Sequence, residues 1–224
     1  MEFLQKPLLI LHIIAGFISI IVFWLPIFTR KGSKSHITSG RLYIYSMWGV
    51  VITAALLSII RVIQGNYGQA MILGFLSLIT AQPLWVGIAI FREKRGLSNT
   101  FLWIRRVFVA IITVYGGIMV SMVVFGEMNN IGPLHLIFGA LGLITGIADL
   151  VQEHKFRKRK PIVHHYASMI ITGAAAYTAF FAFGARSFLE QILTGNLMLI
   201  PWIMPTALAM LTVNLMQRGK LKVA

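Results

Sequence analysis

Seven long stretches without a charged side chain dominate this sequence and decide what it can fold into. A helix needs about 20 consecutive, mainly apolar residues to cross the roughly 30 Å hydrocarbon core of a membrane. The stretches meet this requirement and predict helices over residues 8–28, 42–60, 70–90, 107–125, 131–148, 162–185 and 197–217. We therefore expect an all-α polytopic membrane bundle of seven transmembrane helices, forming a single integral membrane domain over residues 1–224 in a lipid bilayer.

Basic residues are strongly segregated among the segments that join these stretches. Of the 20 Lys and Arg residues, only Lys6, Arg61 and Arg186 fall on one side of the predicted membrane. Loops rich in Lys and Arg stay in the cytoplasm, so we expect a multi-pass protein of the cell membrane with its N-terminus outside and its C-terminus cytoplasmic. The predicted cytoplasmic residues are Arg30, Lys31, Lys34, Arg41, Arg92, Lys94, Arg95, Arg105, Arg106, Lys155, Arg157, Lys158, Arg159, Lys160, Arg218, Lys220 and Lys222.

The net charge of +14 is explained by this topology, with attraction to anionic lipid as a secondary effect, and we expect no nucleic-acid partner. The sequence has no cysteine, which excludes thiolate metal sites and iron–sulfur clusters. No Asp or Glu lies in the middle of a stretch, which argues against a zinc hydrolase and weakens the case for a coupled ion transporter. Any metal or cofactor must therefore be bound by His, Met, carboxylate or main-chain groups.

An internal repeat places histidines at matching positions in two parts of the chain. The motif Leu11-His12-x-x-x-Gly16 recurs as Leu134-His135-x-x-x-Gly139. In each case a basic segment follows, and then a second histidine just before the next stretch: His36 in one part, His164 and His165 in the other. The pattern predicts two parallel repeat halves, approximately residues 7–64 and 130–186, related by an axis along the membrane normal.

The matched histidines suggest a cofactor site near each membrane face. Ionisable residues inside the hydrocarbon are rare and are by default functional candidates. Facing imidazoles at equal depth are what bis-histidine ligation of haem requires, which predicts a His12–His135 pair near the outer face and a His36 pair with His165 or His164 near the inner face. Gly16 and Gly139 lie one turn after the outer histidines, where a missing side chain leaves room for a macrocycle. The alternative is that each histidine bonds a neighbouring hydroxyl or carbonyl and binds no ligand.

The chain resembles the bacterial family catalogued as domain of unknown function 2306. The resemblance is carried by Leu11-His12-x-x-x-Gly16, by Lys31-Gly32-Ser33-Lys34-Ser35-His36-x-x-x-Gly40-Arg41, and by His165-Tyr166-Ala167-Ser168-Met169 followed by Thr178-Ala179-Phe180. More remotely, the repeated order of helix histidine, basic loop and second histidine resembles the two-haem transmembrane b-type cytochromes. That resemblance implies haem b bound by His12 with His135 and by His36 with His165. It also implies electron transfer across the bilayer.

Two further features of the sequence concern packing. Asp149, at the end of the fifth stretch, is expected to form a salt bridge with Arg105 or Arg106. Gly139, Gly142 and Gly146 form a small-residue face that predicts close helix approach.

The leading hypothesis is a membrane protein that binds haem b and carries electrons as a transmembrane oxidoreductase, with a donor and an acceptor that the sequence does not identify. The alternative is a small-solute transporter or a non-catalytic membrane factor with structural histidines.

Overall fold

Helices make up nearly all of the computed structural model, which describes residues 2–93, 96–126 and 132–218. In chain order they are α1 (Glu2–Val22), α2 (Trp24–Phe28), α3 (Lys34–Ile63), α4 (Tyr67–Ala89), η1 (Ile90–Arg92), α5 (Asn99–Phe125), α6 (Pro133–Val151), α7 (Glu153–Lys158), α8 (Pro161–Ala179), η2 (Phe180–Gly184, a π turn), α9 (Arg186–Leu189), η3 (Gly195–Leu199) and α10 (Ile200–Gln217).

Seven segments are long and apolar enough to cross a membrane: Phe3–Phe28, Lys34–Ile63, Tyr67–Arg92, Asn99–Phe125, Pro133–Val151, Pro161–Gly184 and Leu197–Gln217. They confirm the predicted all-α bundle with seven spans. Large apolar side chains stay exposed along the outside of the helices, as a lipid-facing surface requires. The chain is an integral multi-pass membrane protein.

Two helices begin about two turns earlier than the uncharged stretches predict. α3 begins at Lys34 and α5 at Asn99, because Ser33 and Ser98 cap them: their Oγ atoms accept the backbone N–H of His36 and of Phe101, each at 3.2 Å. Three arginines expected in connecting segments therefore lie on helices, namely Arg41, Arg105 and Arg106. The predicted loop residues Lys94, Arg95, Lys220 and Lys222, and the first residue of the predicted 131–148 stretch, lie outside the described residues.

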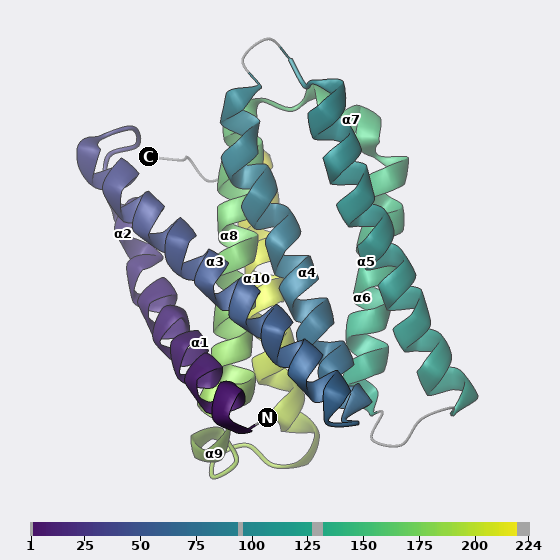
Figure 1. The fold of residues 1–224 in the computed structure, drawn as a ribbon. Coiled ribbons are helices and arrows are strands. Elements are labelled where there is room, and N and C mark those ends of the chain that lie inside the picture. The colour runs from purple at the N-terminus through teal and green to yellow at the C-terminus, as the bar shows by residue number, and fades with distance from the viewer. Residues whose placement is uncertain (1, 94–95, 127–131, 219–224) are drawn as a thin grey trace.

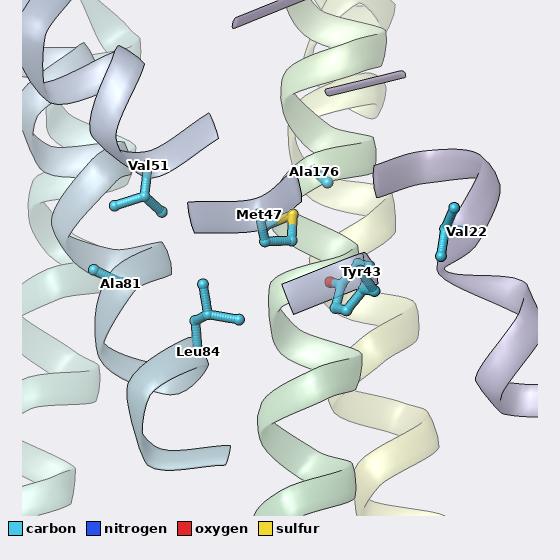
Figure 2. Close-up of a cluster of buried hydrophobic side chains, with 7 residues drawn as sticks. All are labelled: Val22, Tyr43, Met47, Val51, Ala81, Leu84 and Ala176. Atoms are coloured by element: carbon cyan, nitrogen blue, oxygen red, sulfur yellow. The ribbon is translucent and has the colours of Figure 1, made fainter. Parts of the chain in front are cut away.

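α4 is the centre of the bundle. It packs against α3, α5 and α8; α3 in turn packs on α1, α8 on α10, and α5 on α6. As a result α1 and α6 lie on opposite sides of the molecule (Figure 1). One core cluster joins α1, α3, α4 and α8 (Figure 2), and its buried members are Val22, Tyr43, Met47, Val51, Ala81, Leu84 and Ala176.

The contact between α5 and α6 is made through glycines. A Cβ atom on Gly116 would lie 2.7 Å from the carbonyl oxygen of Gly139, and a Cβ on Gly139 would lie 2.9 Å from that of Gly116. Gly142 is equally tight, since its Cβ would lie 2.8 Å from the ring of Phe75. The predicted small-residue face on α6 is confirmed, and α5 is the helix that packs against it.

The two ends of the bundle differ in charge. We call one of them the basic end; it carries the α2–α3 turn, the start of α5, and the α6–α8 connection with α7. The N-terminus, α9 and the α3–α4 turn lie at the opposite end (Figure 1).

Candidate functional site

His135 is a buried structural residue with both ring nitrogens engaged. It is 4% exposed, its Nδ1 accepts the backbone N–H of Gly132 at 3.2 Å, and its Nε2 donates to the carbonyl oxygen of Gly68 at 2.9 Å. Gly132 is the residue that precedes α6, so the imidazole satisfies one of the unpaired N–H groups at that helix start and ties α6 to α4. No lone pair is left on the ring for a metal.

His12 takes part in the contact between α1 and α3. Its Nδ1 lies 2.9 Å from Oγ1 of Thr53, and the Thr53 hydroxyl lies 2.6 Å from the carbonyl oxygen of Gly49. Because a carbonyl only accepts, the hydroxyl donates to Gly49 and Nδ1 of His12 donates to Thr53.

The structure does not bring His12 and His135 together. They bond to different helices, α3 and α4, and their own helices lie on opposite sides of the bundle (Figure 1). The glycines that follow them differ too: a Cβ on Gly16 would meet nothing within 4 Å, whereas Gly139 is filled by α5. The predicted outer pair therefore lacks the facing geometry that shared haem ligation requires, because depth in the membrane does not fix which neighbour a helix faces.

The inner histidines are arranged differently. Nδ1 of His36 lies 2.9 Å from the carbonyl oxygen of Pro26, and Nδ1 of His165 lies 2.8 Å from that of Gly87. Both carbonyls belong to the last turn of a helix, α2 and α4 respectively, where they have no intrahelical partner. Since a carbonyl accepts only, Nδ1 carries the proton in both rings and Nε2 presents its lone pair.

A hydrogen bond between α3 and α8 lies two turns beyond both of these histidines. The hydroxyls of Tyr43 and Thr172 lie 2.9 Å apart in the buried core. Tyr43 follows His36 by seven residues and Thr172 follows His165 by seven, which is about two turns, or about 10 Å, along each helix. His36 and His165 therefore lie at the same distance along their helices from the bonded pair, each on nearly the same helix face as its hydroxyl.

The surroundings of this inner pair are only partly filled. A Cβ on Gly40, one turn after His36, would meet no atom within 4 Å. The ring of Phe91 lies against His165, with 4.8 Å between ring centroids. Both imidazoles are half-buried, so a ligand can reach them from the side.

His164 belongs to another cluster although it is the neighbour of His165 in the chain. It is 5% exposed, its Nε2 donates to the carbonyl oxygen of Phe156 at 3.0 Å, and its ring lies 4.0 Å from the Phe156 ring. Of the two histidines predicted as alternatives for the inner site, His165 is the one on the side of His36.

Sequence reasoning missed the burial of Arg105. This side chain is 1% exposed, pairs with Asp149 at 3.0 Å and places its guanidinium 3.9 Å from the centre of the Phe156 ring. The ion pair itself was predicted and is confirmed. The signal for burial was weak, because the sequence placed Arg105 in a basic loop.

The donor set decides what the inner pair could hold. No group of three or more His, Asp or Glu side chains converges within residues 2–93, 96–126 and 132–218. A metal ion held by protein alone needs about four ligands, whereas an iron held by a macrocycle needs only one or two axial ligands from the protein. Two imidazoles with fixed tautomers suit the second case.

Two surface grooves of about 290 Å³ and about 270 Å³ are lined almost wholly by apolar side chains, and no histidine lines either of them. A comparison of the chain with protein-family models, with curated proteins and with solved structures finds no match. The family resemblance seen in the sequence therefore stays a prediction, and the function is inferred from the histidines and their hydrogen-bond partners.

Proposed function

We propose that this membrane protein binds a b-type haem between α3 and α8, with His36 and His165 as axial ligands. The observation that carries the proposal is the matched spacing of these histidines, two turns from the Tyr43–Thr172 hydrogen bond, with Nδ1 of each ring bonded to a main-chain carbonyl and Nε2 left without a hydrogen-bond partner among the described residues. Under the positive-inside rule the basic end faces the cytoplasm of a cell membrane, which puts the site on the cytoplasmic side.

The protein residues have clear roles in such a site. The carbonyls of Pro26 and Gly87 fix the tautomer and the orientation of each imidazole, as outer-shell partners of metal ligands commonly do. The space beside Gly40 gives a planar group an approach to His36. When bound, a haem supplies one-electron chemistry, so the protein would act as a membrane-bound electron carrier with one site in place of the predicted two.

Absorbance spectroscopy of the purified protein tests this proposal. We expect a Soret band that shifts on reduction with dithionite, and we expect His36→Ala and His165→Ala each to lose most of it. His164→Ala and His154→Ala are matched controls that should keep the band, because the first ring faces Phe156 and the second side chain is exposed. A wild-type protein that stays colourless after titration with haem would overturn the proposal, and so would an unchanged band in His36→Ala.

A second candidate function is favoured by a specific observation. His12, His36, His135, His164 and His165 all bond to a carbonyl or hydroxyl of another helix or turn. This pattern suits a transporter or a non-catalytic membrane factor in which histidines anchor helices. Asn at position 36 or 165 keeps an N–H donor and is a poor haem ligand. On this alternative the wild type is colourless and His36→Asn and His165→Asn melt close to the wild-type temperature.

A further inference from the structure

The short helix α7 lies at the edge of the apolar surface of the bundle. Leu150 and Val151, just before it, are 46% and 71% exposed, and Ile162, just after it, is 45% exposed. Exposed apolar side chains on both flanks place residues 153–160 where the hydrocarbon of a membrane gives way to lipid headgroups. Trp103, 62% exposed on the neighbouring α5, is the kind of residue that marks this level.

The carboxylates near α7 are already neutralised within the protein. Glu153 accepts hydrogen bonds from Arg106 at 2.7 and 2.8 Å and from Arg157 at 2.7 and 3.0 Å. The hydrogen bond from Arg106 is the main reason why the pKa of Glu153 is lowered to about 2. Asp149 pairs with Arg105. The ion pairs of the described residues include none of the exposed cations that we call the basic platform, namely Lys155, Lys158, Arg159 and Lys160.

A single inward-facing aromatic residue holds α7 in place. The Phe156 ring stacks on Phe101 at 6.3 Å between centroids, touches the His164 ring, and receives the Arg105 guanidinium on its face. Nε2 of His164 also bonds the Phe156 carbonyl. A cation held over an aromatic ring away from water is a strong contact. The backbone of α7 is therefore held in place before any ligand arrives, which lowers the entropy lost on binding.

We propose that the basic platform binds the phosphate of an anionic phospholipid. An anion is the ligand that suits the platform, because these four cations form no ion pair within the part of the chain that the structure describes. The exposed apolar side chains on both flanks identify it as a lipid, since its chains would cover Val151 and Ile162 while its phosphate meets the platform. This site is independent of the histidines and of any cofactor.

Native mass spectrometry with added lipid tests the site. We titrate detergent-purified protein with dioleoyl-phosphatidylglycerol or dioleoyl-phosphatidylcholine and compare the amounts retained. The variant Lys155→Gln/Lys158→Gln/Arg159→Gln/Lys160→Gln should lose the preference for phosphatidylglycerol by at least about tenfold, since it removes the cations that would meet one bound phosphate. The matched control Arg30→Gln/Lys34→Gln/Arg41→Gln/Arg92→Gln removes four exposed cations elsewhere at the basic end and should change the preference less than about twofold.

One more variant and a competition with inorganic phosphate complete the test. Phe156→Ala leaves the charge unchanged and should still weaken the preference several-fold, because α7 loses its anchor. Equal losses in the two quadruple variants would mean generic attraction of basic loops and would overturn the proposal. So would displacement of phosphatidylglycerol by inorganic phosphate at equal concentration. The wild-type protein alone also tests the proposal, which matters if a variant fails to fold. Equal retention of phosphatidylglycerol and phosphatidylcholine by the wild type would overturn the site.

Discussion

The inner and outer histidine pairs are alike in sequence and different in structure. His36 and His165 each lie seven residues before the Tyr43–Thr172 hydrogen bond that joins α3 and α8. His12 and His135 lie on α1 and α6, which pack against α3 and α5 on opposite sides of the bundle. The difference comes from helix packing. The glycines of α6 pack closely against α5, and His135 on α6 then faces α4. A repeated motif fixes the depth of a residue in the membrane, while small-residue contacts fix what it faces.

The largest effect should come from breaking the packing that separates the outer pair. In Gly139→Val the side chain would collide with the backbone of Gly116, so we expect a loss of about 3 kcal/mol or more in the free energy of unfolding. Gly40→Val is the matched control in haem-free protein, because the space there is open, and it should change stability by about 0.5 kcal/mol or less. Denaturation in detergent, followed by circular dichroism, measures both. Equal stability of the two variants would contradict the α5–α6 contact.

A smaller effect should separate the two outer histidines from each other. His135→Ala leaves the N–H of Gly132 without a partner and removes the second hydrogen bond to the Gly68 carbonyl, which keeps its bond within α4, and we expect it to cost about 2 kcal/mol. His12→Ala removes one bond to a hydroxyl that keeps its own acceptor, and it should cost about 1 kcal/mol. The same denaturation experiment ranks them, with exposed His154→Ala as the reference. If His12 proved the more costly, the structural role of His135 would be wrong.

The sequence predicted the number and positions of the spans well, because uncharged apolar length is a local property that one chain reports without its neighbours. It missed the first two turns of α3 and α5, since Lys34, Arg41, Arg105 and Arg106 resemble loop residues until the caps at Ser33 and Ser98 are recognised. Ser-x-x before a helix was the signal that would have found them.

The candidate site was predictable only in part. The residue types and levels of His36 and His165 follow from the sequence, but their carbonyl partners do not, because Pro26 and Gly87 become free only where α2 and α4 end. The ion pair of Asp149 with Arg105 followed from the scarcity of acids, whereas the stacking of Arg105 on Phe156 depends on the fold of α7. The orientation of the bundle in a membrane stays a prediction from its charges.

The smallest effect tests the register on which the inner pair depends. Tyr43→Phe and Thr172→Val each remove one hydroxyl of a buried hydrogen bond, and each should cost about 1 kcal/mol. The double variant should cost about 1 kcal/mol less than the sum of the two, because the second change no longer leaves an unpaired group. Ser46→Ala combined with Thr172→Val is the matched control, since the Ser46 hydroxyl bonds within α3, and that pair should show no coupling. Because seven residues separate each hydroxyl from its histidine, coupling between Tyr43 and Thr172 would support the contact of α3 with α8 from which the placement of His36 and His165 is argued, whether or not a cofactor is present. Strict additivity would remove the geometric basis of the inner site.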